Sequence, residues 1–198
     1  MNSAYKFCIY KMIRGIDFII ALVGIIILMP LMLVIFFILY LDNKDPFFFQ
    51  ERIGKNLKKF TLIKFRTMSK GTRNCPTHLV DSSRITPLGA FLRKTKLDEI
   101  PQLWNVLKGE MSFVGPRPCL PIQTELIKVR KELNVHLFLP GITGLAQVKG
   151  IDMSEPLLLA KTEYQMIRDF NLFYYFWFIF RTIIGNGFGD RVKKKTFY

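Results

Sequence analysis

Lys94–Pro118, with the sequence KTKLDEIPQLWNVLKGEMSFVGPRP, is the stretch from which both the local fold and the chemistry of this chain are predicted. Asp98 and Glu99 are adjacent carboxylates where a helix is expected to begin. Apolar side chains then recur at the i, i+3, i+4 and i+7 spacing of one helix face, at Ile100, Leu103, Trp104 and Leu107. Gly109 is of a type that commonly ends a helix. The pattern predicts a short amphipathic helix with two carboxylates at its N-terminal end.

A second pattern follows this helix directly. Residues 111–114 form a short apolar run that predicts a strand, and this run leads into Gly-Pro-Arg-Pro. Pro116 and Pro118 restrict the backbone on both sides of Arg117, which predicts a stiff, extended frame for that arginine. A helix N-terminus attracts anions, and the planar arginine fork matches phosphate oxygens. Together, the two patterns are consistent with half of a phosphate-binding site.

The paired carboxylates admit more than one role. An aspartate at a helix N-terminus, such as Asp98, is most often structural. Nearby cations and a rigid arginine favour chemistry instead, either attack of the carboxylate on phosphorus or binding of Mg²⁺ against a diphosphate. Glycoside hydrolysis fits less well, because adjacent residues rarely place their carboxyl groups on both sides of a scissile bond.

The segments C-terminal to this stretch are less specific. Gln123–Leu133 predicts an amphipathic helix with a structural role. Pro140–Gly150, PGITGLAQVKG, predicts a glycine-punctuated loop that runs into a strand. Neither the P-loop spacing nor the dinucleotide-binding glycine pattern is present, so this loop alone is a weak candidate for binding phosphate.

N-terminal to the stretch, Phe47–Arg52 and Lys58–Met68 predict two short strands around a Gly-Lys-Asn turn. Lys64 and Arg66 are two residues apart, so a strand would point both side chains to the same side. They could form a cationic clamp on phosphates, or they could belong to a solvated edge strand.

Between these strands and the carboxylate pair, a polar loop is expected at residues 69–83, followed by a helix. Thr86 predicts the N-cap of that helix, with Pro87 at its first position. Cations crowd the approach to the carboxylate pair at the end of the helix, at Arg93, Lys94 and Lys96.

Phe18–Leu41 is the membrane-length segment, because its 24 residues include no charged side chain. A spanning helix is the default prediction, but two features favour a helix that returns to the side it entered. Met29 and Pro30 lie near the middle, where proline removes a backbone N–H. Basic residues flank both ends, which draws both ends to the cytosol. We therefore predict a re-entrant, Pro-broken membrane helix, hinged at Met29-Pro30, within an anchoring hairpin at residues 1–45.

Residues 46–198 are predicted to form a cytosolic catalytic domain that lies on the membrane face. Within it, Leu172–Phe180, LFYYFWFIF, is almost wholly aromatic. Nine residues cannot span a bilayer, whereas Tyr and Trp favour the headgroup region, so an interfacial helix is expected, with a buried core helix as the alternative. The basic run Lys193–Lys195 is expected to be attracted to lipid.

Composition limits the partners. The 198 residues carry 29 Lys and Arg against 15 Asp and Glu, a net charge of +14, which implies an anionic partner. Half of the residues are hydrophobic and 19 are Phe, which favours a membrane surface over a soluble nucleic-acid binder. The three cysteines are scattered and show no zinc-binding spacing, so reduced thiols are expected.

Three segments, KFRTM (64–68), RITPLGAFLRKTKLDEIPQLWNVLKGEMSFVGPRP (84–118) and PGITGLAQVKG (140–150), resemble in this order the bacterial sugar transferase family. These are monotopic polyprenyl-phosphate phosphoglycosyltransferases that begin lipid-linked glycan synthesis. The expected fold is therefore α+β and mostly helical, with a small β-hairpin or sheet, the re-entrant membrane helix and interfacial amphipathic helices. Met29 departs from the serine that precedes this proline in many members.

The resemblance implies that the sugar-1-phosphate of a UDP-sugar is transferred to undecaprenyl phosphate, with release of UMP, at the cytosolic face of the bacterial inner membrane. It implies that Asp98 is the nucleophile and a Mg²⁺ ligand, with Glu99 as its partner. It also implies that Pro-Arg-Pro, with Pro116 and Arg117, binds the donor phosphates. Further residues match the family motifs, namely Lys64, Arg66, Arg93 and Gln147, the last without an assigned role.

Two alternatives stay open. One is a non-catalytic, basic membrane scaffold of a glycan assembly complex, which would tolerate loss of both carboxylates. The other is a membrane-attached nucleic-acid-binding protein, whose binding would depend steeply on salt. Because the sequence shows no recognition-helix or RNA-binding signature, no nucleic acid is expected as a partner. The sugar, the glycan pathway and the oligomeric state are not encoded in any pattern that we recognise.

Overall fold

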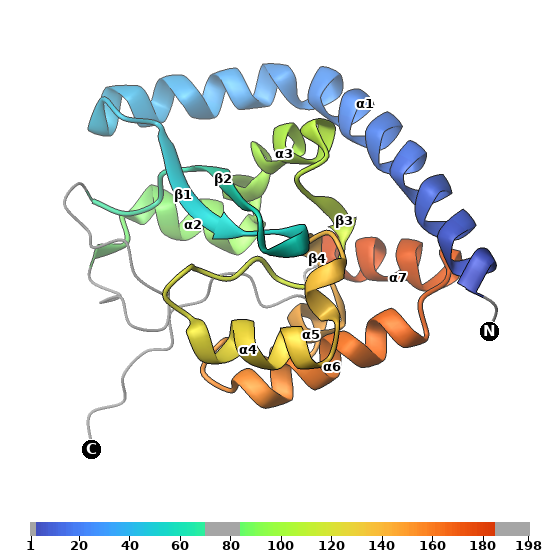
Figure 1. Cartoon of the computed structure of the whole chain (residues 1–198). Coiled ribbons are helices and arrows are strands. Elements are labelled where there is room, and N and C mark those ends of the chain that lie inside the picture. The colour runs from blue at the N-terminus through green and yellow to red at the C-terminus, as the bar shows by residue number, and fades with distance from the viewer. Residues whose placement is uncertain (1–2, 70–83, 185–198) are drawn as a thin grey trace.

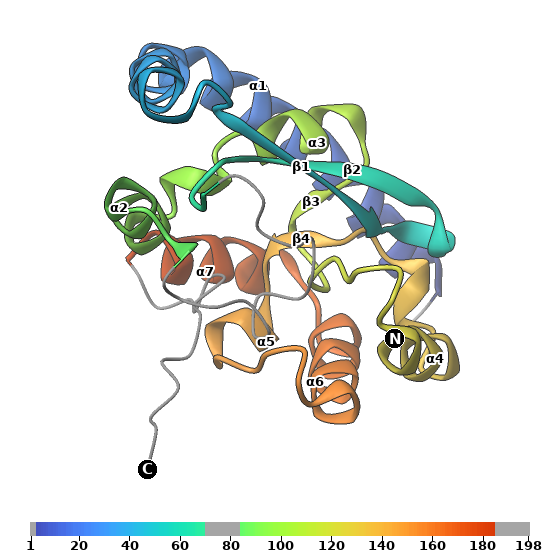
Figure 2. The ribbon, with the colours of Figure 1, turned by 90° about the vertical axis from the view of Figure 1, so that its left-hand side faces the viewer.

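The computed structural model describes residues 3–69 and 84–184, so most of the predicted 69–83 loop and the Lys193–Lys195 tail lie outside the described residues. Helices dominate, and an antiparallel strand pair and a parallel strand pair lie between them (Figures 1 and 2). The α+β, mostly helical fold is confirmed. The elements in chain order are α1 (Ser3–Asn43), β1 (Phe47–Ile53), β2 (Lys59–Phe65), α2 (Pro87–Thr95), α3 (Gln102–Lys108), β3 (Ser112–Val114), α4 (Thr124–Glu132), β4 (Gly141–Thr143), α5 (Leu145–Val148), α6 (Pro156–Arg168) and α7 (Leu172–Ile183).

Helix α1 is the membrane candidate, because Lys11–Asp42 is long and apolar enough to cross a bilayer. It arches over the other elements (Figure 1). The expected break at Pro30 is not present: the helix continues through Pro30, and Met29 and Pro30 are both exposed. A proline removes one backbone hydrogen bond but leaves the turns on either side intact, so an apolar helix bends there without ending. The re-entrant course and the boundary at residue 45 stay predictions.

Polar side chains near the start of α1 fasten it to the rest of the protein. The guanidinium of Arg14 donates to the carbonyls of Val106 and Leu107, at 2.6 and 2.9 Å. These carbonyls at the C-terminal end of α3 thereby gain hydrogen-bond donors that the helix itself does not supply. The buried Asp17 carboxylate accepts from the backbone N–H of Phe113 at 3.1 Å and from the hydroxyl of Tyr175 at 2.8 Å. These contacts tie α1 to α3, β3 and α7.

The β1–β2 hairpin forms as predicted, with Phe47 opposite Phe65 and Ile53 opposite Lys59. Strand β2 ends at Phe65, earlier than the predicted end at Met68. Asn105 of α3 explains how this hairpin is held. Its side-chain oxygen accepts from the Ile63 N–H at 3.2 Å, while its Nδ2 donates to the Thr61 carbonyl at 2.7 Å. The helix that follows the carboxylate pair is therefore fixed to the middle of β2.

Strands β3 and β4 form the parallel pair, with Ser112 opposite Gly141 and Val114 opposite Thr143. The predicted order for residues 140–150 is wrong, because the strand comes first and is followed by the single helical turn α5. The pairing continues past β3, since the N–H of Gly115 donates to the Thr143 carbonyl at 2.9 Å. Glycine at position 141 allows the two backbones to approach this closely.

Gly141→Ala is expected to lower the free energy of unfolding by about 1–3 kcal/mol, because overpacking at a close backbone contact forces the strands apart. A Cβ atom at this position would lie 2.0 Å from the nitrogen of Gly115 and 2.6 Å from the Thr143 carbonyl oxygen. Thermal unfolding in detergent micelles measures the change. Gly15→Ala is the matched control, since its Cβ would meet no heavy atom within 4 Å and α1 should be unaffected or stabilised. Equal melting temperatures for the Gly141 variant and the wild type would contradict the expectation.

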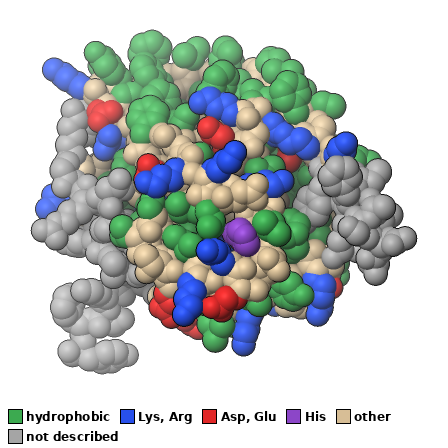
Figure 3. Space-filling model, viewed as in Figure 1, with side chains coloured by type: hydrophobic (Ala, Val, Ile, Leu, Met, Phe, Trp, Pro, Cys, Tyr) green, Lys and Arg blue, Asp and Glu red, His purple; other side chains and the backbone are tan. Residues whose placement is uncertain are grey.

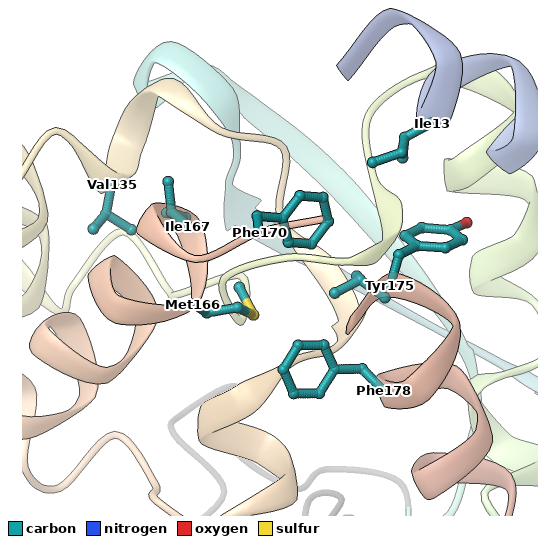
Figure 4. Packing of buried hydrophobic residues seen from close by; sticks show 8 residues of the cluster. Ile13, Val135, Met166, Ile167, Phe170, Tyr175 and Phe178 are labelled. Atoms are coloured by element: carbon teal, nitrogen blue, oxygen red, sulfur yellow. The ribbon is translucent and has the colours of Figure 1, made fainter. Parts of the chain in front are cut away.

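The largest buried apolar cluster joins α1, α6 and α7, and its side chains point toward one another in Figure 4. Tyr175 and Phe178 of α7 are buried in this cluster, as the core-helix alternative predicts, while Phe173 and Phe180 are 73% and 60% exposed. The interfacial location of this helix stays a prediction. Asn171 begins the helix, with its side chain accepting from the Tyr174 N–H at 2.9 Å. One face of α7 therefore belongs to the core and the other is free to contact a membrane surface.

Candidate active site

The carboxylate pair lies in the 3-10 turn Leu97–Glu99, which connects α2 to α3. Lys96 adopts a left-handed conformation (φ 58°) that ends α2, and α3 begins only after Pro101. The carboxylate pair was predicted to open the helix, but α3 begins a few residues later, because the 3-10 turn lies between them. Asp98 is buried, with 5% of its surface exposed.

The predicted N-cap of α2 is confirmed, since the side chain of Thr86 accepts from the Gly89 N–H at 2.9 Å.

Two cations from separate elements face this turn. Lys64 of β2 is buried, and its Nζ lies 3.0 Å from Oε1 of Glu99 in an ion pair. Arg93 of α2 is held by a hydrogen bond from its Nε to the hydroxyl of Thr67 at 2.8 Å. Both cations act on the charge of Asp98. The structure therefore brings together four of the predicted site residues, from β2, α2 and the turn.

The two carboxylates have opposite pKa shifts. Burial raises the pKa of Asp98 to about 6, and the neighbouring Glu99 charge adds to this rise, although Lys64 and Arg93 oppose it. Burial also acts to raise the pKa of Glu99, but the ion pair with Lys64 and the charge of Arg117 outweigh it and leave that pKa below its usual value. Glu99 therefore stays ionised, while Asp98 takes up a proton just below neutral pH.

Arg117 is held through its backbone as well as by the flanking prolines. Its N–H donates to Oε1 of Glu163 at 3.1 Å, and its carbonyl accepts from Nη2 of Arg130 at 2.8 Å. The preceding carbonyl, that of Pro116, accepts from the Gly141 N–H at 2.8 Å. Burial lowers the pKa of Arg117, and the Glu99 charge opposes this shift. The stiff frame predicted from two prolines is thus fixed by a buried ion pair and a strand.

Three residues of this arrangement are not among those predicted from the sequence, namely Arg52, Arg130 and Glu163. Arg52 of β1 donates to the Pro118 carbonyl at 2.8 Å and to the side-chain oxygen of Gln50 at 2.5 Å. Burial and the Arg117 charge lower its pKa to about 9. A signal for Arg52 was available, because Gln50 and Arg52 put polar side chains on one face of a predicted strand. Arg130 and Glu163 belong to ordinary amphipathic helices, and the sequence contains no signal that distinguishes them from other polar residues of those helices.

A small hollow of about 30 Å³ lies beside the turn, lined by Arg52, Lys64, Lys96, Glu99, Arg117, Thr143, Gln147 and Thr182. Gln147 is buried, and within the described part of the chain both polar atoms of its amide lack hydrogen-bond partners. A buried amide without partners carries a free-energy cost that a hydrogen-bonding ligand would remove. The structure thus places Gln147 where a ligand would meet it.

Arg66 is the predicted site residue that the structure places elsewhere. It follows the end of β2, and its Nη2 lies 2.6 Å from Oδ2 of Asp45, while its Nε donates to the Asp45 carbonyl. Its guanidinium also lies over the ring of Phe48, 5.7 Å from the centroid. The expected clamp by Lys64 and Arg66 is therefore not formed, because Arg66 fixes the start of the hairpin.

A larger cavity, of about 420 Å³, lies between α1, β3 and α6 and contains neither carboxylate of the pair. Its polar groups include Arg14 and Asp17, which hold α1 in place. The smaller hollow is the better candidate for chemistry, because it combines buried charges with an unpartnered amide.

The donor atoms suit Mg²⁺ only together with a phosphorylated ligand. In the described residues no group of three or more His, Cys, Asp and Glu side chains could hold a metal. Glu99 is committed to Lys64, which leaves Asp98 as the carboxylate available to a cation. Magnesium is commonly bound by one or two carboxylates plus substrate phosphates, so this donor set fits that mode.

Comparison of the sequence with known proteins shows the family of this chain. The sequence model of the family described as "Bacterial sugar transferase" matches residues 9–187. The UDP-N-acetylgalactosamine-undecaprenyl-phosphate N-acetylgalactosaminephosphotransferase of Aeromonas hydrophila is 34% identical over 190 residues, which cover 90% of this chain and 44% of that protein.

Two further relatives have a similar sequence identity to this chain. The undecaprenyl-phosphate galactose phosphotransferase of Salmonella typhimurium is 35% identical over 69% of this chain and 32% of its own length. The exopolysaccharide production protein ExoY of Rhizobium meliloti is 32% identical over 86% of this chain and 83% of its own length. The chain thus spans less than half the length of the Aeromonas and Salmonella proteins. The match extends over nearly the whole chain, and the protein belongs to the bacterial sugar transferase family.

Proposed function

We propose that the protein transfers sugar-1-phosphate from a UDP-sugar to undecaprenyl phosphate and releases UMP. The names of the Aeromonas and Salmonella relatives support the two substrates. The observation that carries the proposal is an excess of positive charge around the carboxylate pair, in which Asp98 is buried and Glu99 is partly buried. Two carboxylates are surrounded by five cations, Arg52, Lys64, Arg93, Lys96 and Arg117. The diphosphate of a bound UDP-sugar, with two negative charges, would offset most of this excess of three positive charges.

In the first step, a carboxylate oxygen of Asp98 attacks the phosphorus that bears the sugar. The bond between that phosphorus and the oxygen of UMP breaks, UMP leaves with the electron pair, and the sugar phosphate is bound covalently to Asp98. Arg117 and Lys64 stabilise the charge on the phosphate oxygens during this step. The raised pKa of Asp98 fits a carboxylate that must give up its ionised form when the new bond forms.

In the second step, a phosphate oxygen of undecaprenyl phosphate attacks the same phosphorus. The bond to Asp98 breaks, the carboxylate is restored, and undecaprenyl diphosphate sugar is released. Glu99 has a lowered pKa and is therefore a poor proton acceptor. We assign it the role of holding Lys64 in place beside both phosphates. Mg²⁺, when bound by Asp98 and the diphosphate, would neutralise phosphate charge.

The surface of the protein fits a reaction between a soluble donor and a lipid acceptor. Hydrophobic side chains gather over α1, and Lys and Arg side chains lie below them (Figure 3). With the exposed aromatic face of α7, this arrangement suits attachment to the cytosolic face of the bacterial inner membrane. Labelling both chain ends with a membrane-impermeant reagent tests the re-entrant course, since labelling of only the N-terminus from outside would refute it.

The test of the proposed reaction is a UMP-release screen with purified protein, a panel of UDP-sugars, undecaprenyl phosphate and Mg²⁺. We expect one or a few UDP-sugars to release UMP, and a short pre-incubation with donor alone to add one sugar phosphate to the intact protein mass. The mass shift should disappear when undecaprenyl phosphate is added. If donor and acceptor react without any donor-only burst of UMP, the covalent route is wrong.

The rate of the donor-only burst is expected to fall below pH 6, by about tenfold per pH unit, because protonated Asp98 is not a nucleophile and its pKa is about 6. Single-turnover UMP release between pH 4.5 and 8 measures this. Glu99→Gln should move the inflection to lower pH, since it removes the negative charge that helps to raise the Asp98 pKa. A burst rate that stays constant down to pH 5 would contradict the assignment.

A further inference from the structure

A third concave surface, which is almost wholly apolar, lies next to the carboxylate turn. It has a volume of about 280 Å³ and is open to the outside. Ile25 and Met32 of α1 form one wall, Phe49 and Ile63 of the hairpin form another, and Ile100 and Trp104 form the third. Trp104 and Phe49 are 51% and 57% exposed at its mouth. Exposed aromatic side chains around an apolar hollow are typical of a ligand site.

The position of this groove connects it to the reaction centre. The turn and the start of α3 contribute to both surfaces, since Glu99 and Gln102 line the charged hollow while Ile100 and Trp104 line the groove. Strand β2 does the same, because Lys64 faces the hollow and its neighbour Ile63 faces the groove. The charged hollow and the apolar groove therefore lie on opposite faces of β2, and different residues of the segment 99–104 line the one or the other.

The other wall of the groove is the membrane candidate itself. Ile25 and Met32 lie within the apolar part of α1, next to outward-facing residues such as Ile26, Met29 and Leu33 that are at least half exposed. A ligand in the groove would thus have bilayer-facing protein surface at one end and buried phosphate-binding cations at the other. This order, apolar chain and then anionic head, is that of a prenyl phosphate.

We propose that this groove binds the first isoprene units of the lipid acceptor, with the acceptor phosphate reaching the carboxylate pair around residues 99–102. The inference rests on the proposed function. A volume of 280 Å³ holds only the part of the chain nearest the phosphate, and the remainder stays in the bilayer. The groove fixes the direction from which the second nucleophile approaches Asp98, and the donor does not contact it.

The test uses full-length protein in mixed micelles, the donor identified by the UMP screen, and two acceptors: undecaprenyl phosphate and a water-soluble, two-isoprene prenyl phosphate. Trp104→Ala removes one wall, and Ile25→Trp fills the groove. For both variants we expect KM to rise roughly tenfold for each acceptor. The donor-only burst and the KM for UDP-sugar should remain at wild-type values, which also shows that the variants are folded. Phe173→Ala is the matched control, because it removes an exposed aromatic ring away from the groove.

The possible outcomes distinguish a failure of the groove proposal from a failure of the proposed reaction. An effect on undecaprenyl phosphate alone would mean that the variants weaken membrane contact in general, and it would overturn the proposal. KM values within twofold of wild type for both acceptors would also overturn the proposal. So would a loss of acceptor turnover that is accompanied by a change in oligomeric state, because the groove would then be a contact between copies of the protein. Absence of any UMP release by the wild type, with every UDP-sugar of the panel and undecaprenyl phosphate both present, would instead reject the proposed function itself.

Discussion

Asp98→Asn is expected to reduce UMP release by about four orders of magnitude or more and, at the same time, to make the protein more stable above pH 6. The loss of activity follows if the carboxylate is the nucleophile, because the amide cannot form the bond to phosphorus. Lys64, Arg93 and Glu99 would remain in place around a side chain of the same shape. Donor binding should therefore persist while the chemical step is lost.

The gain in stability follows from the sign of the pKa shift. Burial raises the pKa of Asp98 from 3.8 to about 6, so the folded state holds this proton more tightly than the unfolded state does. Its favourable contribution is complete below about pH 4 and is lost as the pH rises through 6, where the ionised form is buried. At pH 7 the asparagine variant avoids this cost, which is roughly 2–3 kcal/mol. The advantage over wild type should shrink as the pH falls toward 4.

Two measurements on the same preparation decide this prediction: UMP release with donor and acceptor, and thermal unfolding between pH 4 and 8. Asp169→Asn is the matched control, because that carboxylate belongs to an exposed ion pair with Arg168 and should change neither quantity much. Full activity in the Asp98 variant would reject the nucleophile and would favour a scaffold. An inactive variant that is also less stable would show that Asp98 is mainly structural.

The features predicted correctly from sequence are those with local causes. The capped start of α2, the hairpin, the end of α3 at Gly109 and the apolar course of α1 each depend on residues adjacent in the chain. The pairing of Asp98 with surrounding cations was predicted in outline because Arg93 and Lys96 lie close in sequence. Arg117 and Lys64 were predicted from the flanking prolines and from the strand spacing, and the family resemblance added Gln147. The structure brings all three to the same turn or hollow.

The features that could not be predicted depend on contacts between distant segments. Arg66 has the spacing of a clamp residue, but β2 ends before it and Asp45 engages it. Gly141 begins a strand because β3 lies beside it, and nothing local distinguishes that strand from a loop. Arg130 and Glu163 are 33 residues apart, and each fits the polar pattern of its own helix. Their importance is visible only when α4 and α6 are seen together.

The Arg130–Glu163 ion pair carries the second large prediction. Nη2 of Arg130 lies 2.6 Å from Oε1 of Glu163, its Nε lies 2.8 Å from Oε2, and the two side chains are 7% and 1% exposed. Burial raises the pKa of Glu163, whereas the Glu163 charge outweighs the effect of burial on Arg130 and raises the pKa of the arginine. Because both carboxylate oxygens accept hydrogen bonds, the geometry indicates an ionised pair.

Glu163→Gln is expected to lower the free energy of unfolding by about 3–5 kcal/mol, because it leaves the Arg130 guanidinium buried without its counter-charge. Thermal or urea unfolding in micelles measures the loss. Glu51→Gln is the matched control, since Glu51 pairs with Lys59 at 3.0 Å on the surface and its loss should change stability by less than about 1 kcal/mol. A similar small change in both variants would contradict a structural role for the buried pair.

Replacing both partners separates stability from function. Arg130→Met combined with Glu163→Leu removes both charges, so it should recover most of the stability that Glu163→Gln loses. It cannot restore the two hydrogen bonds to the backbone N–H and carbonyl of Arg117. If this pair positions Arg117 for the donor phosphates, the stable double variant will have a higher KM for the UDP-sugar and an unchanged KM for the lipid acceptor. A pair that served stability alone would leave both KM values at the wild-type level, so this double variant shows whether the buried Arg130–Glu163 ion pair belongs to the active site.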